Sequence, residues 1–268
     1  MTPPSFSVYG LATPLIRPGD DVTEHLISAA EHSECRGFEG GDVVVVAESA
    51  VATAEGRVVR LADVEPSGKA LRLADEYHMD PRHVEVVLRE SDRVVGGIPG
   101  FLLCMKNGTL LPNAGIDASN APHGSVVLLP LDPDASAARI RAAVRERSGA
   151  DVGVIVIDSR THAMRLGCCG VAIGCSGIPS VIDERGKKDL FGRELEVTKR
   201  AVADCIASAA ELVMGEAGEC VPAAVVRGIG LPVGDYAGVA TIDASECLFM
   251  GVALHADPSL LVKDDRES

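Results

Sequence analysis

The sequence contains no tryptophan, and aromatic residues make up only 3% of its 268 residues. This scarcity argues against a nucleic-acid platform built from stacked aromatic rings. Basic residues are also in deficit, because 25 Lys and Arg face 39 Asp and Glu, which gives a formal net charge of −14. Such a protein repels a phosphate backbone or an anionic membrane, so we expect neither as a partner. An anionic small substrate then needs metal cations or a few local Arg and Lys side chains.

Long apolar runs are also missing. No stretch reaches the roughly 18 to 20 residues that a membrane-spanning helix needs, and residues 1–5 lack the pattern of a signal peptide. We therefore expect a cytoplasmic protein whose eight cysteines are reduced thiols. Apolar residues still make up 47% of the chain and charged residues 24%. These values are typical of a folded protein, here with a core of Val, Ala, Leu and Ile.

Strand-like and helix-like segments alternate, with Gly and Pro between them. Apolar runs predict three strands, at residues 43–47, 152–157 and 222–228. Apolar residues at helical spacing predict two helices, one from about 134 to 147 with its cap in Asp134 to Ser136, and one from about 194 to 214. We expect Gly149 and Gly215 to end them. Loops are expected near 66–68, 112–115 and 130–134, but none reads as a linker, so residues 1–268 are predicted to form one α/β unit of two interleaved lobes.

Three acidic positions stand out because of their surroundings. Asp117 lies in a polar, Gly-containing turn, Asp158 and Ser159 end a predicted strand, and Glu216 follows a predicted helix. Carboxylates at strand ends lie at the rim of an α/β sheet, where ligands bind. Such oxygen ligands suit Mg²⁺ or Mn²⁺, especially when substrate phosphates complete the shell. The alternative is ordinary capping, because Asp and Ser are common where strands end and turns begin.

A Gly-rich stretch, residues 167–177, matches neither a P-loop nor a dinucleotide fingerprint. Its glycines indicate either close approach of a ligand to the backbone or tight strand packing. Its three cysteines, Cys168, Cys169 and Cys175, do not have the spacing of a zinc or iron–sulfur site, which favours small buried thiols. The seven histidines form no metal-binding pattern, and no Ser/His/Asp triad or general base is identifiable.

Residues 183–194 gather cationic side chains among acidic ones. In so acidic a protein this cluster is a candidate anion site, with Lys188 and Arg193 as its candidate ligands. The alternative is a solvated loop before a helix.

Several segments occur in the order found in one enzyme family. They are 10–11 with 14–21, 54–57, 113–120 (Asn-Ala-Gly-Ile-Asp-Ala-Ser-Asn), 130–134, 158–159, 172–174, 188–198 (beginning Lys-Asp-Leu-Phe-Gly-Arg-Glu-Leu), 214–216 and 225–228. Together they span residues 8 to about 230, and the two spelled-out stretches are the specific ones. The sequence resembles the coenzyme F420-0:γ-glutamyl ligase family.

The resemblance implies an α/β (α+β) fold with mixed sheets flanked by helices, in an intertwined homodimer. It implies a ligase that joins L-glutamate to the lactyl carboxylate of a deazaflavin coenzyme precursor, with GTP as co-substrate. It also implies two Mg²⁺ or Mn²⁺ ions per site, with K⁺ as a further candidate, held by Asp117, Asp158, Ser159 and Glu216. The nucleotide contacts that it implies are Leu11, Pro14, Leu15, Ser49, Thr53, Asn120, Gly215 and Gly218.

The sequence departs from the family pattern at two places. Ala52 and Thr53 stand where the family has Ser-Lys, and Thr161 and His162 stand where it has Gly-Arg. Arg160 and Arg165 are nearby cations that can compensate. Two alternatives therefore stay open: a paralogous ligase that uses another carboxylate acceptor or nucleotide, and a non-catalytic protein that binds metal through thiols.

Overall fold

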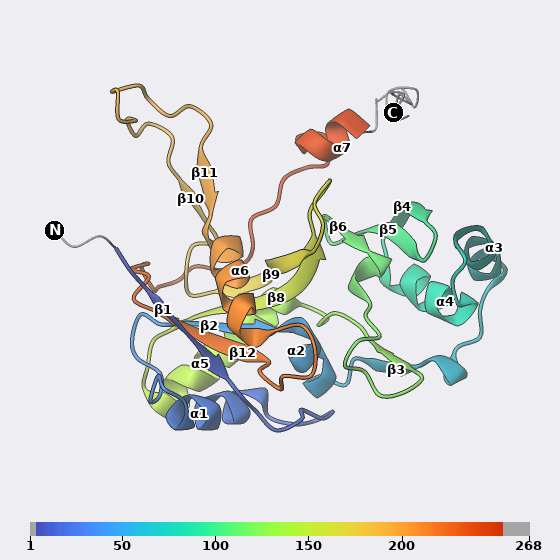
Figure 1. The fold of residues 1–268 in the computed structure, drawn as a ribbon, viewed down its shortest axis with the longest axis horizontal. Coiled ribbons are helices and arrows are strands. Elements are labelled where there is room, and N and C mark those ends of the chain that lie inside the picture. Colours follow the sequence, from blue (N-terminus) through green and yellow to red (C-terminus); the bar gives the residue numbers. More distant parts are fainter. Residues whose placement is uncertain (1–3, 254–268) are drawn as a thin grey trace, which may run out of the picture.

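The computed structural model describes residues 4–253, a mixed α/β arrangement with several sheets (Figure 1). Its strands are β1 (Ser7–Leu11), β2 (Val43–Ala47), β3 (Val58–Arg60), β4 (Arg93–Ile98), β5 (Phe101–Lys106), β6 (Thr109–Pro112), β7 (Ser125–Val127), β8 (Gly153–Thr161), β9 (Cys168–Ser176), β10 (Val181–Asp183), β11 (Lys199–Ala201) and β12 (Ala223–Arg227). Its α-helices are α1 (Val22–His32), α2 (Glu48–Ala54), α3 (Gly68–Tyr77), α4 (Pro81–Glu90), α5 (Pro133–Ser148), α6 (Val202–Met214) and α7 (Leu248–Ala253). Within the described residues, no helix is long and apolar enough to span a bilayer.

The largest sheet has the strand order β1-β12-β2-β8-β9. The pair β2–β8 is parallel and the other neighbours are antiparallel. Val44 and Val46 face a cluster that includes α1 and α5, whereas Val43 and Val45 face a cluster that includes α6. Because successive side chains point to opposite faces, this double burial explains the continuous apolar run of β2 and confirms the strand predicted at 43–47.

The remaining segments between β2 and α5 form a third hydrophobic cluster. It is built from α3 and α4 with the β4-β5-β6 and β3-β7 sheets, and its buried side chains include Val84, Leu102 and Ile116. Figure 1 shows these elements beside the edge of the main sheet. The predicted homodimer and the interleaving of two lobes stay predictions.

The glycines of β9 show that the packing alternative holds for the Gly-rich stretch. A Cβ on Gly170 would lie 2.6 Å from the Ala207 oxygen of α6, and one on Gly174 would lie 2.3 Å from the Pro133 oxygen of α5. Helices on both faces therefore approach this strand too closely for a side chain. The expectation of buried thiols is right for Cys175 but wrong for Cys168 and Cys169, which are exposed.

Two helix starts differ from the predictions. The helix expected from about 194 begins only at Val202, because Lys199–Ala201 pairs with Val181–Asp183 as an antiparallel ribbon. Of residues 194–201 only Leu195 is half-buried and the others are exposed, so no apolar helix face is buried there. In the other helix Asp132, and not the predicted 134–136 segment, caps α5, since its Oδ1 accepts from the Ala135 N–H at 2.9 Å. The C-terminal predictions are confirmed, as Gly149 and Gly215 follow α5 and α6.

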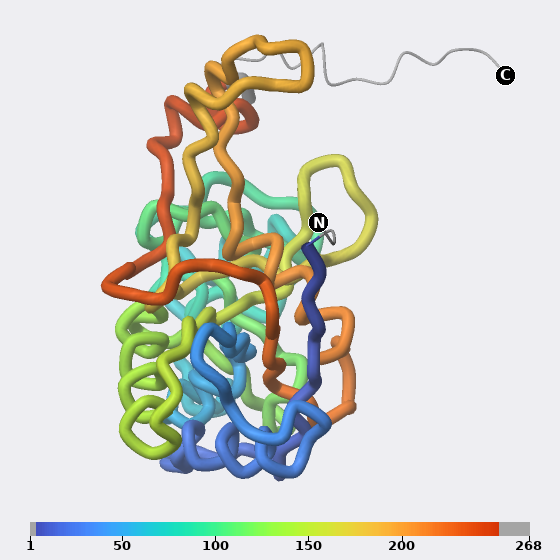
Figure 2. The backbone as a smooth tube through the Cα atoms, turned by 90° about the vertical axis from the view of Figure 1, so that its left-hand side faces the viewer, coloured from blue at the N-terminus to red at the C-terminus, as the bar shows by residue number. Residues whose placement is uncertain are grey.

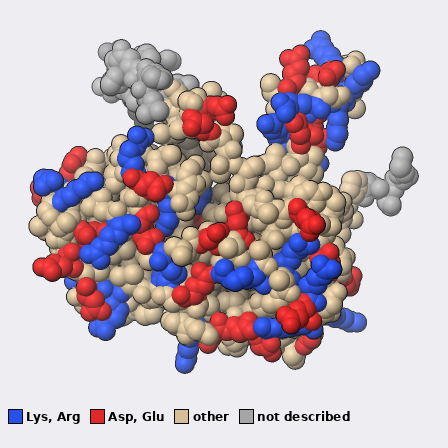
Figure 3. All heavy atoms as spheres, turned by 180° about the vertical axis from the view of Figure 1, so that it is seen from behind, with Lys and Arg blue, Asp and Glu red and all other residues tan. Residues whose placement is uncertain are grey.

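Strands β10 and β11 with the connecting residues 184–198 form an arm that projects from the rest of the chain (Figures 1 and 2). Both cationic and acidic side chains gather on it (Figure 3). Its Leu190 and Phe191 are 99% and 90% exposed. An apolar pair this exposed gains nothing from the fold of its own chain.

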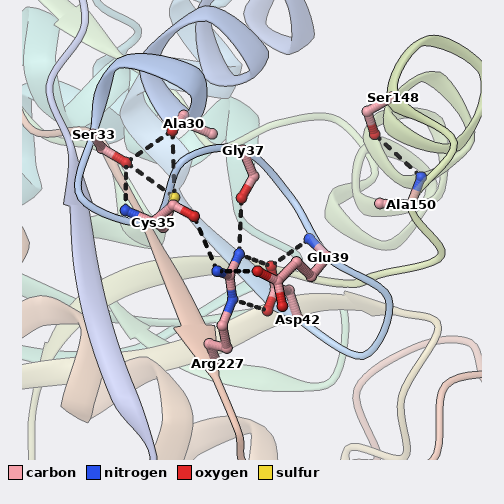
Figure 4. A network of polar contacts seen from close by, with 9 residues as sticks. All are labelled: Ala30, Ser33, Cys35, Gly37, Glu39, Asp42, Ser148, Ala150 and Arg227. Atoms are coloured by element: carbon pink, nitrogen blue, oxygen red, sulfur yellow. Dashed lines mark hydrogen bonds and ion pairs between the residues drawn. The ribbon is translucent and has the colours of Figure 1, made fainter.

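A network around Arg227 lies at the end of the main sheet where β2 begins and β12 ends (Figure 4). The Arg227 guanidinium donates to both carboxylate oxygens of Asp42 at 2.8 Å, to Glu39 at 2.7 Å, and to the carbonyl oxygens of Cys35 and Gly37. Asp42 is 1% exposed. The network ties β12 to the loop between α1 and β2, far along both strands from the site described next.

Candidate active site

A cleft of about 600 Å³ opens at the carboxyl ends of the parallel strands β2 and β8. Its walls come from stretches within residues 13–16, 47–53, 112–120, 157–161 and 211–222. Ligands bind at this edge in open α/β sheets because the strands end there and their loops diverge. The cleft is therefore the place where the predicted site residues have to meet.

Most of the predicted residues do meet there. The cleft is lined by the predicted metal ligands and by most of the predicted nucleotide contacts, together with one candidate cation: Pro14, Leu15, Ser49, Thr53, Asp117, Asn120, Asp158, Ser159, Arg160, Gly215, Glu216 and Gly218. Four predicted residues lie outside its lining. Leu11 is fully buried in β1, Arg165 is exposed on the β8–β9 loop, and Lys188 and Arg193 lie on the arm. The binding roles of all these residues stay predictions.

The turn before Asp117 has an unusual backbone that fixes this carboxylate in place. Asn113, Ala114 and Gly115 all have positive φ angles, and a Cβ on Gly115 would lie 2.6 Å from Leu129. The Asp117 main chain then exchanges hydrogen bonds of 3.1 and 2.8 Å with Val127. Asp117 is thus held by its backbone, and its side chain, whose Oδ1 accepts from the Ser119 N–H at 2.9 Å, lines the cleft.

Strand β8 positions the next two groups on opposite faces. Asp158 Oδ2 accepts from Arg160 Nε at 2.8 Å, on the same face of the strand. Ser159, on the other face, donates its hydroxyl to Glu216 Oε1 at 3.0 Å. The sequence predicts Asp158 and Ser159 at the end of the strand, but β8 continues to Thr161, so both residues are paired within the strand.

Two further carboxylates face the same space, and sequence reasoning missed both. Burial, and then the charge of Asp158, raise the pKa of Glu48 to about 8. Burial, and then a hydrogen bond that the protonated Glu211 carboxyl donates to Glu216, raise the pKa of Glu211 to about 7. Burial also raises the pKa of Asp158, although Arg160 opposes it. The signal for Glu48 was available, because it directly follows a buried strand just as Asp158 was expected to do.

The cleft is strongly acidic. Within residues 4–253, its lining holds one Lys or Arg, namely Arg160, which is already paired with Asp158. The same lining holds six carboxylates: Glu48, Asp117, Asp158, Glu211, Glu216 and Glu219. Repulsion within such a set favours a bound cation, and carboxylate oxygens suit Mg²⁺ or Mn²⁺.

The carboxylates of the cleft therefore fit divalent cations, but they do not form a complete metal site by themselves. Among the described residues, no three His, Cys, Asp or Glu side chains converge on one point as a ready metal site. Mg²⁺ is commonly bound by only one or two carboxylates, with water and substrate phosphates completing its shell. The same observation removes support for a metal site built on the cysteines of the described chain.

Both departures from the family pattern reach the cleft, since Thr53 and Thr161 line it. His162 lies outside the lining, with its ring packed edge-on against Phe249 at 5.2 Å between ring centroids. Of the two arginines expected to compensate, only Arg160 reaches the cleft. Thr53, which stands where the family has a lysine, therefore lines the cleft but brings no positive charge to it.

Comparison with known proteins identifies the family. The profile of the F420-0:Gamma-glutamyl ligase family matches residues 10–228. The chain belongs to this family. It is 47% identical over 215 residues to a coenzyme F420:L-glutamate ligase of Methanopyrus kandleri, covering 80% of this chain and 83% of that protein. It is 45% identical over 226 residues to the protein of that name from Archaeoglobus fulgidus, covering 84% and 88%. A relative with the same name from Haloarcula marismortui is 43% identical over 239 residues, covering 87% and 89%.

The match to the F420-0:gamma-glutamyl ligases extends over the whole cleft, because its lining residues fall between Thr13 and Pro222. It also extends over the arm. The resemblance read from the short segments is thus confirmed by similarity over most of the chain.

Proposed function

We propose that this protein joins L-glutamate to the lactyl carboxylate of coenzyme F420-0 through an amide bond, with GTP as the energy source. Membership of the ligase family and the names of its relatives support the reaction class. The observation that carries the proposal for this chain is the cleft, where six carboxylates surround a single arginine. A site of this kind accepts a polyphosphate only together with cations.

The chemistry follows from the acceptor. A carboxylate is a poor electrophile, so the γ-phosphoryl group of GTP is first transferred to it, which gives an acyl phosphate and GDP. The glutamate amine then attacks the acyl carbon, an amide forms, and inorganic phosphate leaves with the electron pair of the broken C–O bond. Phosphoryl transfer depends on in-line positioning and charge neutralisation.

The residues of the cleft divide this work. Asp117, Asp158, Ser159 and Glu216 hold two Mg²⁺ or Mn²⁺ ions, which neutralise phosphate charge when bound. Arg160 contributes the protein's own positive charge at the same place. The nucleotide contacts are the amide of Asn120 and the chain near Pro14, Leu15, Gly215 and Gly218. K⁺ is a further candidate ion at the site. No general base is assigned.

The proposed active form is a homodimer in which the arm packs on the second copy. Leu190 and Phe191 support this, because nothing in the described chain shields them from water. The arm also brings Lys188 and Arg193, cations that the cleft lacks, to the surface that would meet the partner.

Turnover of the purified chain tests the proposal. Phosphate release and product mass are measured with coenzyme F420-0, GTP, Mn²⁺ and glutamate. We expect Asp158→Asn to lower turnover at least about 100-fold, since even outer residues of metal sites change activity 10- to 100-fold. Asp63→Asn is the matched control, because its side chain is 68% exposed in a weak ion pair outside the cleft. No turnover by the wild type, together with no nucleotide binding by calorimetry, rejects the proposal.

One observation favours a second candidate, a paralogous ligase with another carboxylate acceptor or nucleotide. Thr53 lines the cleft where the family has a lysine. This candidate gives metal-dependent nucleotide binding but no glutamylated deazaflavin, so the same assay separates the two.

A further inference from the structure

The three-stranded sheet beside the cleft has one buried and one open face. Along β5, Leu102 and Cys104 are buried, whereas Phe101 and Leu103 are exposed. Ile98 of β4 pairs with Phe101, so it shares the open face. Phe101 and Ile98 are 53% and 65% exposed. An apolar surface therefore lies open on a sheet whose other face is part of the protein core.

This open face continues into the cleft. Phe101 and Pro112 both line the cleft, and Phe101 is its one aromatic lining residue within the described chain. Pro112 pairs with Leu103 across the β5–β6 ladder, which places it on the same face. The cleft is thus acidic at the ends of β2 and β8 and apolar where it meets this sheet.

The apolar surface is fixed relative to the acidic end. The Asn113 side chain accepts a hydrogen bond from the Leu102 N–H at 2.9 Å, and Asn113 begins the turn that leads to Asp117. At the other side of Phe101, Gly100 donates its N–H to the Tyr77 carbonyl oxygen at 2.7 Å. Both neighbours of Phe101 are therefore tied down, and its ring projects from a rigid strand.

We infer that Phe101, flanked by Pro112 and Ile98, is the platform on which the planar ring system of the coenzyme stacks, while the coenzyme carboxylate reaches the acidic end of the cleft. This inference rests on the proposed function. A flat heteroaromatic ring presents π-faces that need apolar contact and no hydrogen bonds. The side chains of Phe101, Pro112 and Ile98 provide apolar contact and have no hydrogen-bonding groups.

The nucleobase of GTP is the competing occupant of this surface, because it also has π-faces and a polar edge. Its predicted contacts are other lining residues of the cleft, namely Pro14, Leu15, Asn120, Gly215 and Gly218. Polar groups are available elsewhere in the cleft, such as the Asn120 amide, which donates to the Ala217 carbonyl oxygen at 3.2 Å. The platform therefore distinguishes the acceptor from the nucleotide.

Steady-state kinetics with each substrate varied in turn tests this assignment. We expect Phe101→Ala to raise the KM for the coenzyme roughly 5- to 100-fold, the range found when a stacking aromatic is removed, with the KM values for GTP and glutamate unchanged. Phe101→Tyr keeps the ring and should keep the KM. Phe6→Ala is the matched control, because Phe6 is 50% exposed and lies outside the cleft.

Equilibrium binding of the coenzyme, measured by ultrafiltration, separates this inference from the proposed function. Unchanged coenzyme KM and affinity in an active Phe101→Ala variant overturn the platform, as does a rise in the KM for GTP. Loss of the dimer in Phe101→Ala, seen by light scattering, also overturns it, because the ring would then be covered by protein. A wild type that neither turns over nor binds the coenzyme rejects both the proposed function and the platform. A wild type that binds the coenzyme without turnover rejects the proposed function alone. The coenzyme affinity of Phe101→Ala then decides whether the platform holds.

Discussion

Arg227 is a residue whose interactions stabilise the fold and which lies outside the cleft. Replacing it by methionine removes both guanidinium donors to Asp42 and leaves the Glu39 N–H as a neutral donor to this buried carboxylate. We expect Arg227→Met to lower the free energy of unfolding by about 3–5 kcal/mol, because an uncompensated buried charge remains. Urea unfolding measures it.

The control for this change is Arg82→Met, since the ion pair of Arg82 with Asp80 is more than a third exposed and such pairs contribute about 0–1 kcal/mol. Equal losses for the two variants contradict the expectation.

Glu90 gives a prediction for pH dependence. Burial raises its pKa, but Lys106 and Arg57 outweigh this and hold the pKa below its usual 4.5; the two ion pairs measure 2.7 and 2.8 Å. As pH falls below about 4.5, the unfolded chain takes up the proton first, which favours unfolding. The stability from Glu90 is therefore complete above that pH and is lost as the pH falls through the lower pKa of the folded state.

Thermal melts of the wild type and Glu90→Gln between pH 3 and 7 test this. We expect the wild type to be more stable at pH 7, and the difference to shrink with acid. A difference that stays constant over this range contradicts the assignment.

At the scale of elements, β9 is limited by its neighbours. A side chain on Gly174 would meet the carbonyl oxygen of Pro133 at the start of α5. We expect Gly174→Ala to cost about 1–3 kcal/mol, because the helix has to shift. Gly96→Ala is the matched control in β4, where an added Cβ meets no atom within 4 Å. Denaturation of both variants measures the difference, and equal stability contradicts this packing.

The elements also show what sequence periodicity can and cannot predict. The strand at 43–47 was predictable because both of its faces are buried. The arm was not predictable, since its strands have only three residues each and pair residues that are 16 to 20 positions apart in the sequence. The predicted cap of α5 was two residues too late, because several acidic residues there can cap a helix. Asp132 is the cap, whereas Asp134 accepts from the Cys175 N–H of β9.

At the scale of the whole molecule, the arm leads to a prediction about assembly. If Leu190 and Phe191 pack on a second copy, replacing both by Asp places two charges in an apolar contact. We expect that double variant to be monomeric by analytical ultracentrifugation and to stay folded, with a melting temperature lowered only by the lost association. Leu131→Asp, at a 76% exposed leucine outside the arm, is the control. A monomeric wild type contradicts the proposed homodimer.

The candidate site was predictable where the family motifs reach it. Asp117 and Asp158 stand in recognisable segments, and the structure places both on the cleft. Glu211 was not predictable, because a glutamate in an amphipathic helix is usually solvated, and only the packing of α6 against β9 brings it against the Gly170 backbone. The arm cations were expected at an anion site, but they lie away from the cleft on a ribbon whose second strand, Lys199–Ala201, was predicted as part of a helix.

The cleft joins stretches of chain that are up to 209 positions apart, from Thr13 to Pro222. A small molecule bound there acts as a non-covalent cross-link between the first strand and the last. A partly unfolded form that has lost any of these stretches lacks a complete binding surface, so the binding energy opposes each opening that disrupts the cleft. At 100 times its dissociation constant, such a ligand adds about 2.7 kcal/mol to the free energy of unfolding, and protection from proteolysis should then spread across the chain well beyond the residues it touches.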